Sequence, residues 1–241
     1  MKINYFNVTF WFNICDNHLE VLEKFRKEFK DEYENFNIKN NTNNLLEPII
    51  MAINEKNNSK LIMSQINFQF IKDNTNIKEI KEFKEHLLKI FETLNSSKIE
   101  ILHTSIFVNG EVCIDNALDK IIKNTINKNL INENIIDVTL KFGKKEEDLF
   151  YKIITLINKK QIKIPRKIDE KGRTIPIPLI SWNGNLVENE MIDISYEIND
   201  KYSFDFTKNY HTTDFYLNKM LYILINNFEN DIENLLEKGE F

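Results

Sequence analysis

Near the start of the chain, apolar and polar residues first alternate and then follow a longer period. In residues 7–14 (NVTFWFNI) every second side chain is apolar, which predicts a half-buried strand. From residue 17 to 36 the apolar side chains recur every three or four positions, which is typical of one face of a helix. The helical stripe consists of Leu22, Phe25, Phe29, Tyr33 and Phe36.

The order of a strand and a helix recurs in the rest of the first half. Residues 60–73 predict a second strand, and residues 77–94 predict a second amphipathic helix. Between residues 37 and 59 we expect a loop with a short ordered piece around Ile49–Ile53. Residues 98–112 are apolar on both faces, as expected for a central strand that is covered on both sides. The prediction for the first half is therefore β-α-β-α-β.

The second half is predicted as α-β-β-β-α. A helix begins at Asp115 and reaches Leu130, and a long closing helix runs from about Thr213 to Leu236. Between them lie three strand-like segments, at 135–143, 149–164 and 190–198, with Tyr202–Phe206 as an extension of the last strand. Residues 149–158 also fit a helix, because a short apolar run does not separate the two structures.

Together these elements predict an α+β fold with a largely antiparallel sheet, packed amphipathic helices and a long C-terminal helix. No linker rich in Gly, Pro or Ser interrupts the chain. We therefore expect residues 1–241 to form a single compact unit. Two sub-halves, 1–112 and 113–241, are the alternative.

The composition is that of an ordinary globular protein, with 42% hydrophobic and 29% charged residues. Two cysteines fit neither a disulfide framework nor a zinc site. The chain shows no leader peptide and no apolar run of about 18 residues, the length that a membrane span needs. These observations predict a reduced, cytoplasmic protein without a metal ion, a cofactor or a membrane contact.

Charge is distributed unevenly along the chain. The net charge of the protein is −5, yet residues 159–173 alone carry +5, so the other residues carry −10. Prolines at 165, 176 and 178 interrupt this region and its continuation, and proline lacks the amide donor of a central strand. The sequence therefore predicts an edge strand or a projecting arm beside a basic loop.

This arm and loop are the first predicted binding surface, for a protein partner or a second copy of the chain. Its predicted contact residues are Arg166, Lys167, Arg173, Ile175, Ile177, Leu179 and Trp182. Two alternatives stay open: the arm folds onto its own domain, or the basic strip 159–173 binds nucleic acid or a nucleotide.

A second predicted surface is the polar side of strands 7–14 and 60–73. If the two strands are neighbours, Trp11 lies among uncharged side chains, with Gln65 and Asn67 on the other strand. Such a face suits protein contact or stacking of a base on the indole. The alternative is that another part of the chain covers it.

Candidate catalytic residues are few. Glu82 and His86 lie one helical turn apart, but no third metal ligand accompanies them. His103 is a candidate general base, although a buried neutral histidine is favoured because no nucleophile lies at a known spacing. Asp193 and Ser195 share one strand face. A hydrolase or nuclease built on His103 or Asp193 is therefore the least favoured hypothesis.

Three segments resemble those of a sporadically distributed, uncharacterised prokaryotic family of α+β proteins of about this length. They are NVTFWFNI, SIFVNGEV with Phe107 and Asn109, and MIDISYEI followed by the long closing helix. Family members usually carry arginines where this chain has Ile106 and Gly110. The family's distribution, together with the composition typical of an AT-rich genome, suggests phage–host or mobile-element conflict. We therefore expect a non-enzymatic protein-binding module in that setting, and its partner can be a second copy of the chain.

Overall fold

The computed structural model describes residues 2–38, 44–114, 121, 123–124, 138–146, 150–163, 166–168, 173–176 and 187–240. Its first half contains β1 (Lys2–Phe12), α1 (His18–Phe29), β2 (Glu34–Ile38), β3 (Ile50–Asn54), β4 (Ser59–Met63), β5 (Asn67–Thr75), α2 (Ile77–Glu82), α3 (Lys84–Ser96) and β6 (Ile101–Cys113). Its second half contains β7 (Thr139–Glu146), β8 (Phe150–Lys163), β9 (Arg166–Ile168), β10 (Thr174–Pro176), β11 (Val187–Asn199), α5 (Lys201–Phe206) and α6 (Asp214–Lys238).

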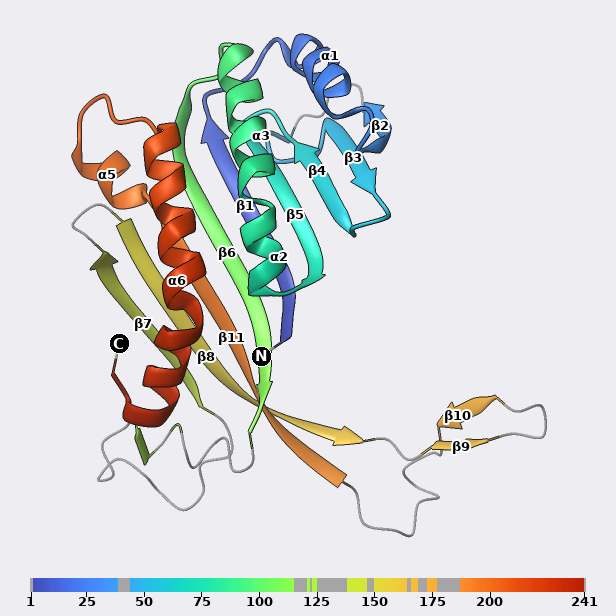
Figure 1. The fold of residues 1–241 in the computed structure, drawn as a ribbon, viewed down its shortest axis with the longest axis vertical. Coiled ribbons are helices and arrows are strands. Elements are labelled where there is room, and N and C mark those ends of the chain that lie inside the picture. Colours follow the sequence, from blue (N-terminus) through green and yellow to red (C-terminus); the bar gives the residue numbers. More distant parts are fainter. Residues whose placement is uncertain are drawn as a thin grey trace.

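One sheet of nine strands runs through both halves, in the order β2-β3-β4-β5-β1-β6-β11-β8-β7 (Figure 1). Every neighbouring pair is antiparallel. Strands β1 and β6 pair at the centre of the sheet, where Val8 lies opposite Ile106. Strand β5, on the other side of β1, precedes α2 and α3, and β11, on the other side of β6, precedes α5 and α6. The predicted α+β fold is confirmed, and one sheet joins the two halves.

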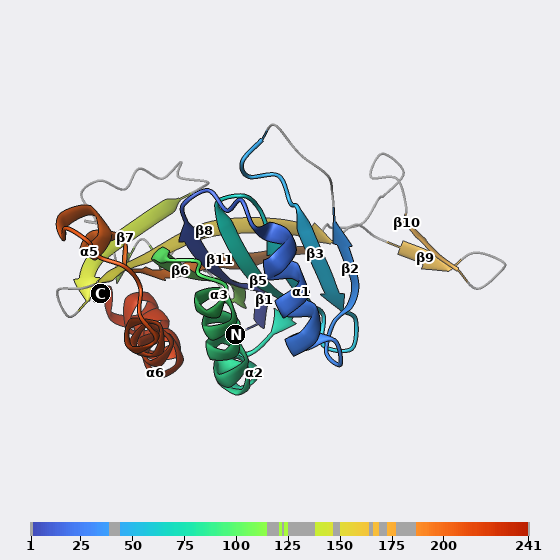
Figure 2. The same cartoon turned by 90° about the horizontal axis from the view of Figure 1, so that it is seen from above.

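Helices α1, α2, α3 and α6 lie on one face of this sheet (Figure 2). The strand side chains that point toward them are buried, and aromatic rings fill the space between the layers. Phe10 of β1 packs against Phe91 of α3 with ring centroids 5.9 Å apart, and Tyr196 of β11 packs against Phe228 of α6 at 5.1 Å. Full burial of one such ring contributes about 1.5–3 kcal/mol, so this layer supplies the main stabilisation of the fold.

The opposite side of the sheet, called the open face below, carries the alternate side chains. On β6 the buried residues Ile106 and Val108 alternate with the half-buried Ser105 and Phe107. The prediction that residues 98–112 are covered on both sides is therefore wrong. Of the described helices, α5 reaches the open face at one end, where Phe204 contacts the His103 ring and Tyr202 contacts Tyr151.

The predicted strand 60–73 is in fact a hairpin of two strands, β4 and β5. The hydroxyl of Ser64 accepts hydrogen bonds from the amides of Ile66 and Asn67, and the Ser64 amide donates to the Asn67 carbonyl. These local bonds close a tight turn, which a search for alternating side chains does not detect. Gln65 therefore lies in a turn and not on a strand.

Two further short segments differ from the prediction because their local pattern does not fix their secondary structure. The first helix ends at Phe29, and residues 34–38 form the edge strand β2, which pairs with β3. Residues 202–206 belong to helix α5 and do not extend the last strand. Short segments with few apolar residues take the structure that their neighbours permit.

Two further predictions of secondary structure hold in the described residues. Residues 149–158 form a strand within β8, and the long C-terminal helix is α6. Thr213 caps its N-terminus by accepting from the Tyr216 amide, and Gly239 ends it with a left-handed φ of 70°. Most of the predicted helix 115–130 lies outside the described residues. No helix in the described ranges is both long and apolar enough to cross a membrane.

Candidate binding surfaces

Strands β8 and β11 continue beyond the sheet as a ribbon of their own. The pairing of β11 with β6 ends at Met191 and Cys113, whereas its pairing with β8 continues to Val187 and Lys163. Residues 160–163 and 187–190 thus form a two-stranded ribbon, which leaves the sheet in Figure 1.

Beyond this ribbon lies the hairpin arm, which consists of β9 and β10. The two strands pair through three residue pairs and, within the described ranges, belong to no other sheet. In two perpendicular views the hairpin arm stands apart from the nine-stranded sheet and from the helices (Figures 1 and 2). The described part of the arm is thus extended and projecting.

The predicted contact residues of the arm fall partly within the described ranges. Arg166 and Lys167 lie on β9, and Ile175 of β10 lies opposite Lys167. Arg173 is exposed just before β10. The other three predicted residues, Ile177, Leu179 and Trp182, lie outside the described residues. The binding role of all seven stays a prediction.

The second predicted surface, around Trp11, is a hydrogen-bonded part of the open face. Strands β1 and β5 are neighbours, with Trp11 opposite Asn67 and Thr9 opposite Gln69. The Asn7 amide donates to the Gln69 side chain at 3.2 Å and accepts from the Thr9 hydroxyl at 2.8 Å. The polar groups therefore bind one another along the sheet, and Asn67 is only 2% exposed.

Trp11 itself is half-buried and stacks on His103, the residue opposite it on β6. The ring centroids are 5.6 Å apart and the planes are inclined by 21°. Phe204 of α5 contacts the other side of this pair, with its centroid 5.5 Å from His103. The indole is thus already stacked within the chain, which leaves less of it for a base or a partner.

Regular alternation along a strand would place His103 and Ile101 on the same face, but in the structure they lie on opposite faces. The pairing of β1 with β6 is irregular here: Trp11 lies opposite His103, but Phe12 lies opposite Ile101. This bulge turns Ile101 toward the helices and His103 toward the open face. Burial, with a smaller contribution from Lys201, lowers the pKa of His103 to about 4. Such an imidazole is a weak base at neutral pH.

His86 lies mostly inside the structure, with 12% of its side chain exposed. The helix that the sequence predicts as continuous is interrupted at Phe83, so Glu82 and His86 belong to different helices. The His86 ring bonds Glu32 at 3.0 Å through Nδ1 and the Tyr33 hydroxyl at 3.0 Å through Nε2. The Tyr33 hydroxyl in turn bonds Ser59 at 3.0 Å.

This chain of four side chains resembles a proton relay, but its surroundings indicate a structural role. Tyr33 and Ser59 are buried, and burial raises the pKa of the Tyr33 hydroxyl. Burial also lowers the pKa of His86, so its ring is neutral near pH 7. The bonds connect α3 with the turn after α1 and with β4. No group of three metal-ligating side chains occurs among the described residues.

Asp193 lies on the open face and is hydrogen-bonded to Asn109 of β6. The Asn109 amide donates to the Asp193 carboxylate at 3.1 Å and to the Ile194 carbonyl at 3.3 Å. Ser195 lies opposite Asn109 in the register of β11 and β6. These bonds connect β6 of the first half to β11 of the second half.

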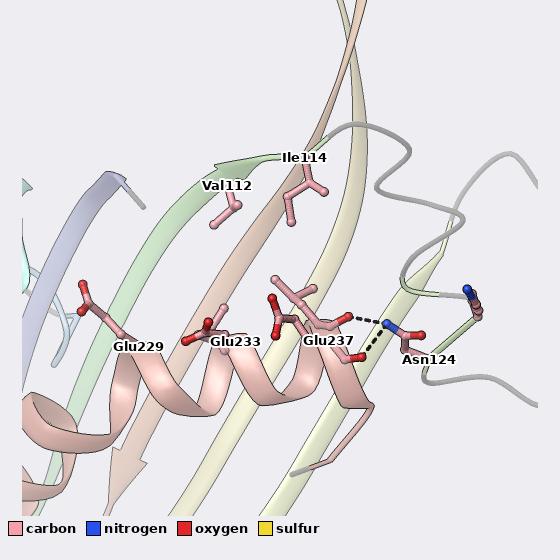
Figure 3. A pocket seen from close by; sticks show the side chains of 9 residues that line it. Val112, Ile114, Asn124, Glu229, Glu233 and Glu237 are labelled. Atoms are coloured by element: carbon pink, nitrogen blue, oxygen red, sulfur yellow. Dashed lines mark hydrogen bonds between the residues drawn. The ribbon is translucent and has the colours of Figure 1, made fainter.

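A third surface, which the sequence did not reveal, is a groove between the end of β6 and the last turns of α6. Its cavity volume is about 550 Å³. In Figure 3, Val112 and Ile114 point from β6 toward the helix. The Asn124 amide donates to the carbonyls of Leu236 and Glu237 and so closes one end of the groove.

Three carboxylates line the helix side of this groove, against one basic residue, Lys123, on the opposite side, and we call it the acidic groove. They are Glu229, Glu233 and Glu237, spaced four residues apart on α6 and all exposed. Side chains with this spacing share one side of a helix. The four-residue spacing of these glutamates can be seen in the sequence, but the same spacing is common on a solvated helix face. Only the position of β6 shows that these carboxylates border an apolar cavity.

No protein-family model matches this chain, and no curated protein sequence matches it at a significant level.

Proposed function

We propose that this protein is a non-enzymatic binding module that contacts a protein partner or a second copy of the chain through its hairpin arm. The observation that carries the proposal is the separation of β9 and β10 from the body. A two-stranded hairpin with no further layer is only marginally stable in water. Among the described residues no further strand pairs with its edges, which there present backbone groups for another strand. Contact with another surface satisfies both needs.

The chemistry of the histidines favours binding over catalysis. His86 bonds Glu32 and Tyr33, in a partly buried cluster. His103 is stacked against Trp11, and its pKa of about 4 makes it a poor general base at neutral pH. The resemblance of the chain outline to a sporadically distributed prokaryotic family supports, as a biological setting, phage–host or mobile-element conflict.

The second candidate function is nucleic-acid or nucleotide binding by the basic strip 159–173. The register of the ribbon weakens this candidate, because Glu188 and Glu190 of β11 lie opposite Ile162 and Lys160. With these two acidic residues the net charge of the region falls from +5 to +3. A phosphate backbone is therefore attracted less strongly than the basic strip alone suggests.

Replacement of residues 164–186 by Asn-Gly tests the proposal. Lys163 and Val187 lie opposite each other, so a two-residue turn can join them and leave the sheet unchanged. We expect this arm-replaced chain to lose the partner that the intact chain captures from source-cell extract, or to lose self-association in sedimentation velocity. The variant Trp182→Ala/Arg173→Glu should weaken the same contact.

If both variants capture the same partner and sediment as the wild type does, the hairpin arm does not make the contact and the proposed function is wrong. Nucleic-acid binding is measured in parallel, with a fluorescent oligonucleotide at increasing salt. Tight binding at low salt that falls steeply with salt and disappears in the arm-replaced chain would support the second candidate instead.

A further inference from the structure

The acidic groove and the hairpin arm have opposite charge, although they belong to the same chain. Glu229, Glu233 and Glu237 form one row along the groove. Within the described part of the chain none of the three is in an ion pair with a basic side chain. Like charges four residues apart on a helix repel one another. Lys123 also lines the groove, so the lining carries a net charge of −2, and a cationic occupant would relieve the remaining repulsion.

The floor of the groove is apolar, so its occupant should combine positive charge with apolar side chains. Val112 of β6 and Ile114, just after its end, contribute from one side, and Ile232 and Leu236 contribute from α6. The hairpin arm has this composition. Arg166, Lys167 and Ile168 form β9, and Ile175 lies at the centre of β10. The arm belongs to the region that still carries a net charge of +3 when Glu188 and Glu190 are counted.

We infer that the acidic groove receives the hairpin arm of a second copy, and that two copies exchange arms. The arm of the same chain is an unsuitable occupant in this structure, because it stands away from α6 in both views (Figures 1 and 2). A contact between two different patches of one chain closes into a dimer when each copy supplies both, around a two-fold axis. This inference rests on the proposed function and names its partner.

Charge reversal in full-length chains tests the exchange. A groove variant carries Glu233→Lys and Glu237→Lys, and an arm variant carries Arg166→Glu and Lys167→Glu. Each variant alone brings like charges together at both contacts, so we expect its self-association to be about tenfold weaker than that of the wild type, within the range of such pairs. Sedimentation velocity over a concentration series measures the dissociation constant.

An equimolar mixture of the two variants provides the decisive measurement. In the mixed dimer the acidic arm of one chain meets the basic groove of the other, and the basic arm meets the unchanged acidic groove. Association should therefore return in the mixture, and also in a single chain that carries all four substitutions. The matched control Glu23→Lys/Glu28→Lys changes two exposed carboxylates on α1 and should self-associate as the wild type does. Thermal unfolding establishes that each variant is folded.

The outcomes separate this inference from the proposed function. If the charge variants associate like the wild type while the arm-replaced chain does not, the arm contacts another surface and the groove inference is wrong. If the wild type is monomeric at every concentration, arm exchange is wrong, and the function then depends on capture of a different protein. A mixture that stays monomeric while both variants are monomeric also overturns the exchange.

Discussion

Trp11 and His103 face each other across the central strands β1 and β6, with their rings stacked 5.6 Å apart. This contact holds the imidazole where burial lowers its pKa from the ordinary 6.5 to about 4. As the pH falls from 6.5 toward 4, the unfolded chain binds a proton at this site that the folded chain does not. The stability that the neutral ring provides is thus present above pH 6.5 and is lost below it.

The variant His103→Phe keeps a ring against Trp11 and removes the titration. Between pH 7 and pH 5 the free energy of unfolding should therefore fall by about 1 kcal/mol less in the variant than in the wild type, after allowance for the partial exposure of the ring. Urea unfolding at both pH values measures this difference. Lys201 and Asp205, the charged groups that act on His103, are unchanged in both proteins. Equal losses in the two proteins would contradict the prediction.

A buried ion pair connects the last helix to the sheet. The Lys152 ammonium of β8 lies 2.8 Å from the Asp231 carboxylate of α6 and 3.0 Å from Glu146 of β7. The Tyr196 hydroxyl donates to the same Asp231 oxygen at 2.7 Å. Burial alone would lower the pKa of Lys152, but its bonds to Asp231 and Glu146 raise the pKa above the ordinary value.

We expect Lys152→Met to cost about 3–5 kcal/mol in the free energy of unfolding, because it leaves a buried carboxylate without its cation. The double variant Lys152→Met/Asp231→Leu removes both charges and should cost less than Lys152→Met alone. Urea unfolding of the wild type, both single variants and the double variant gives the coupling energy. Strictly additive losses would show that the two side chains do not interact.

Asn158 of β8 is 4% exposed, and neither its amide nitrogen nor its side-chain oxygen has a hydrogen-bond partner in the part of the chain that the structure describes. A buried polar group without a partner costs about 1–3 kcal/mol. Asn158→Leu should therefore raise the midpoint of urea unfolding. Asn199→Leu is the matched control, since Asn199 is 6% exposed but bonds Glu197 and the Lys201 amide. The control should lower the midpoint, and a loss at Asn158 as well would refute this account.

Gly110 of β6 allows the backbone of β1 to approach closely. A Cβ atom at this position would lie 2.6 Å from the carbonyl oxygen of Lys2, whereas at Gly143 the nearest atom is 3.9 Å away. Gly110→Ala should therefore destabilise the fold by about 1–3 kcal/mol. Gly143→Ala should be neutral or slightly stabilising, because alanine restricts the unfolded chain. Thermal unfolding compares the two, and similar effects would contradict the steric argument. Any larger side chain at position 110, arginine included, would meet the Lys2 carbonyl in the same way and would require β1 to move.

The sequence predicted the elements whose pattern depends on near neighbours alone. The alternation in residues 7–14 predicted most of β1, and the stripe from Leu217 to Leu235 predicted α6, since both follow from one face of a regular element being buried. The prolines and basic residues correctly indicated an extended segment near 166–176. The carboxylates of the acidic groove were not identified, because their spacing looks the same on any exposed helix.

By itself, the sequence determined where apolar faces occur and where the backbone must be extended, because these properties depend on residues a few positions apart. The tertiary structure decided which strands are neighbours. It also decided that His103 turns to the open face at a bulge and that His86 packs against Tyr33. A groove lined by Glu233 lies between the end of β6 and α6 for the same reason. Each of these depends on contacts between residues far apart in the chain, and the energy of such contacts has no counterpart in a local pattern.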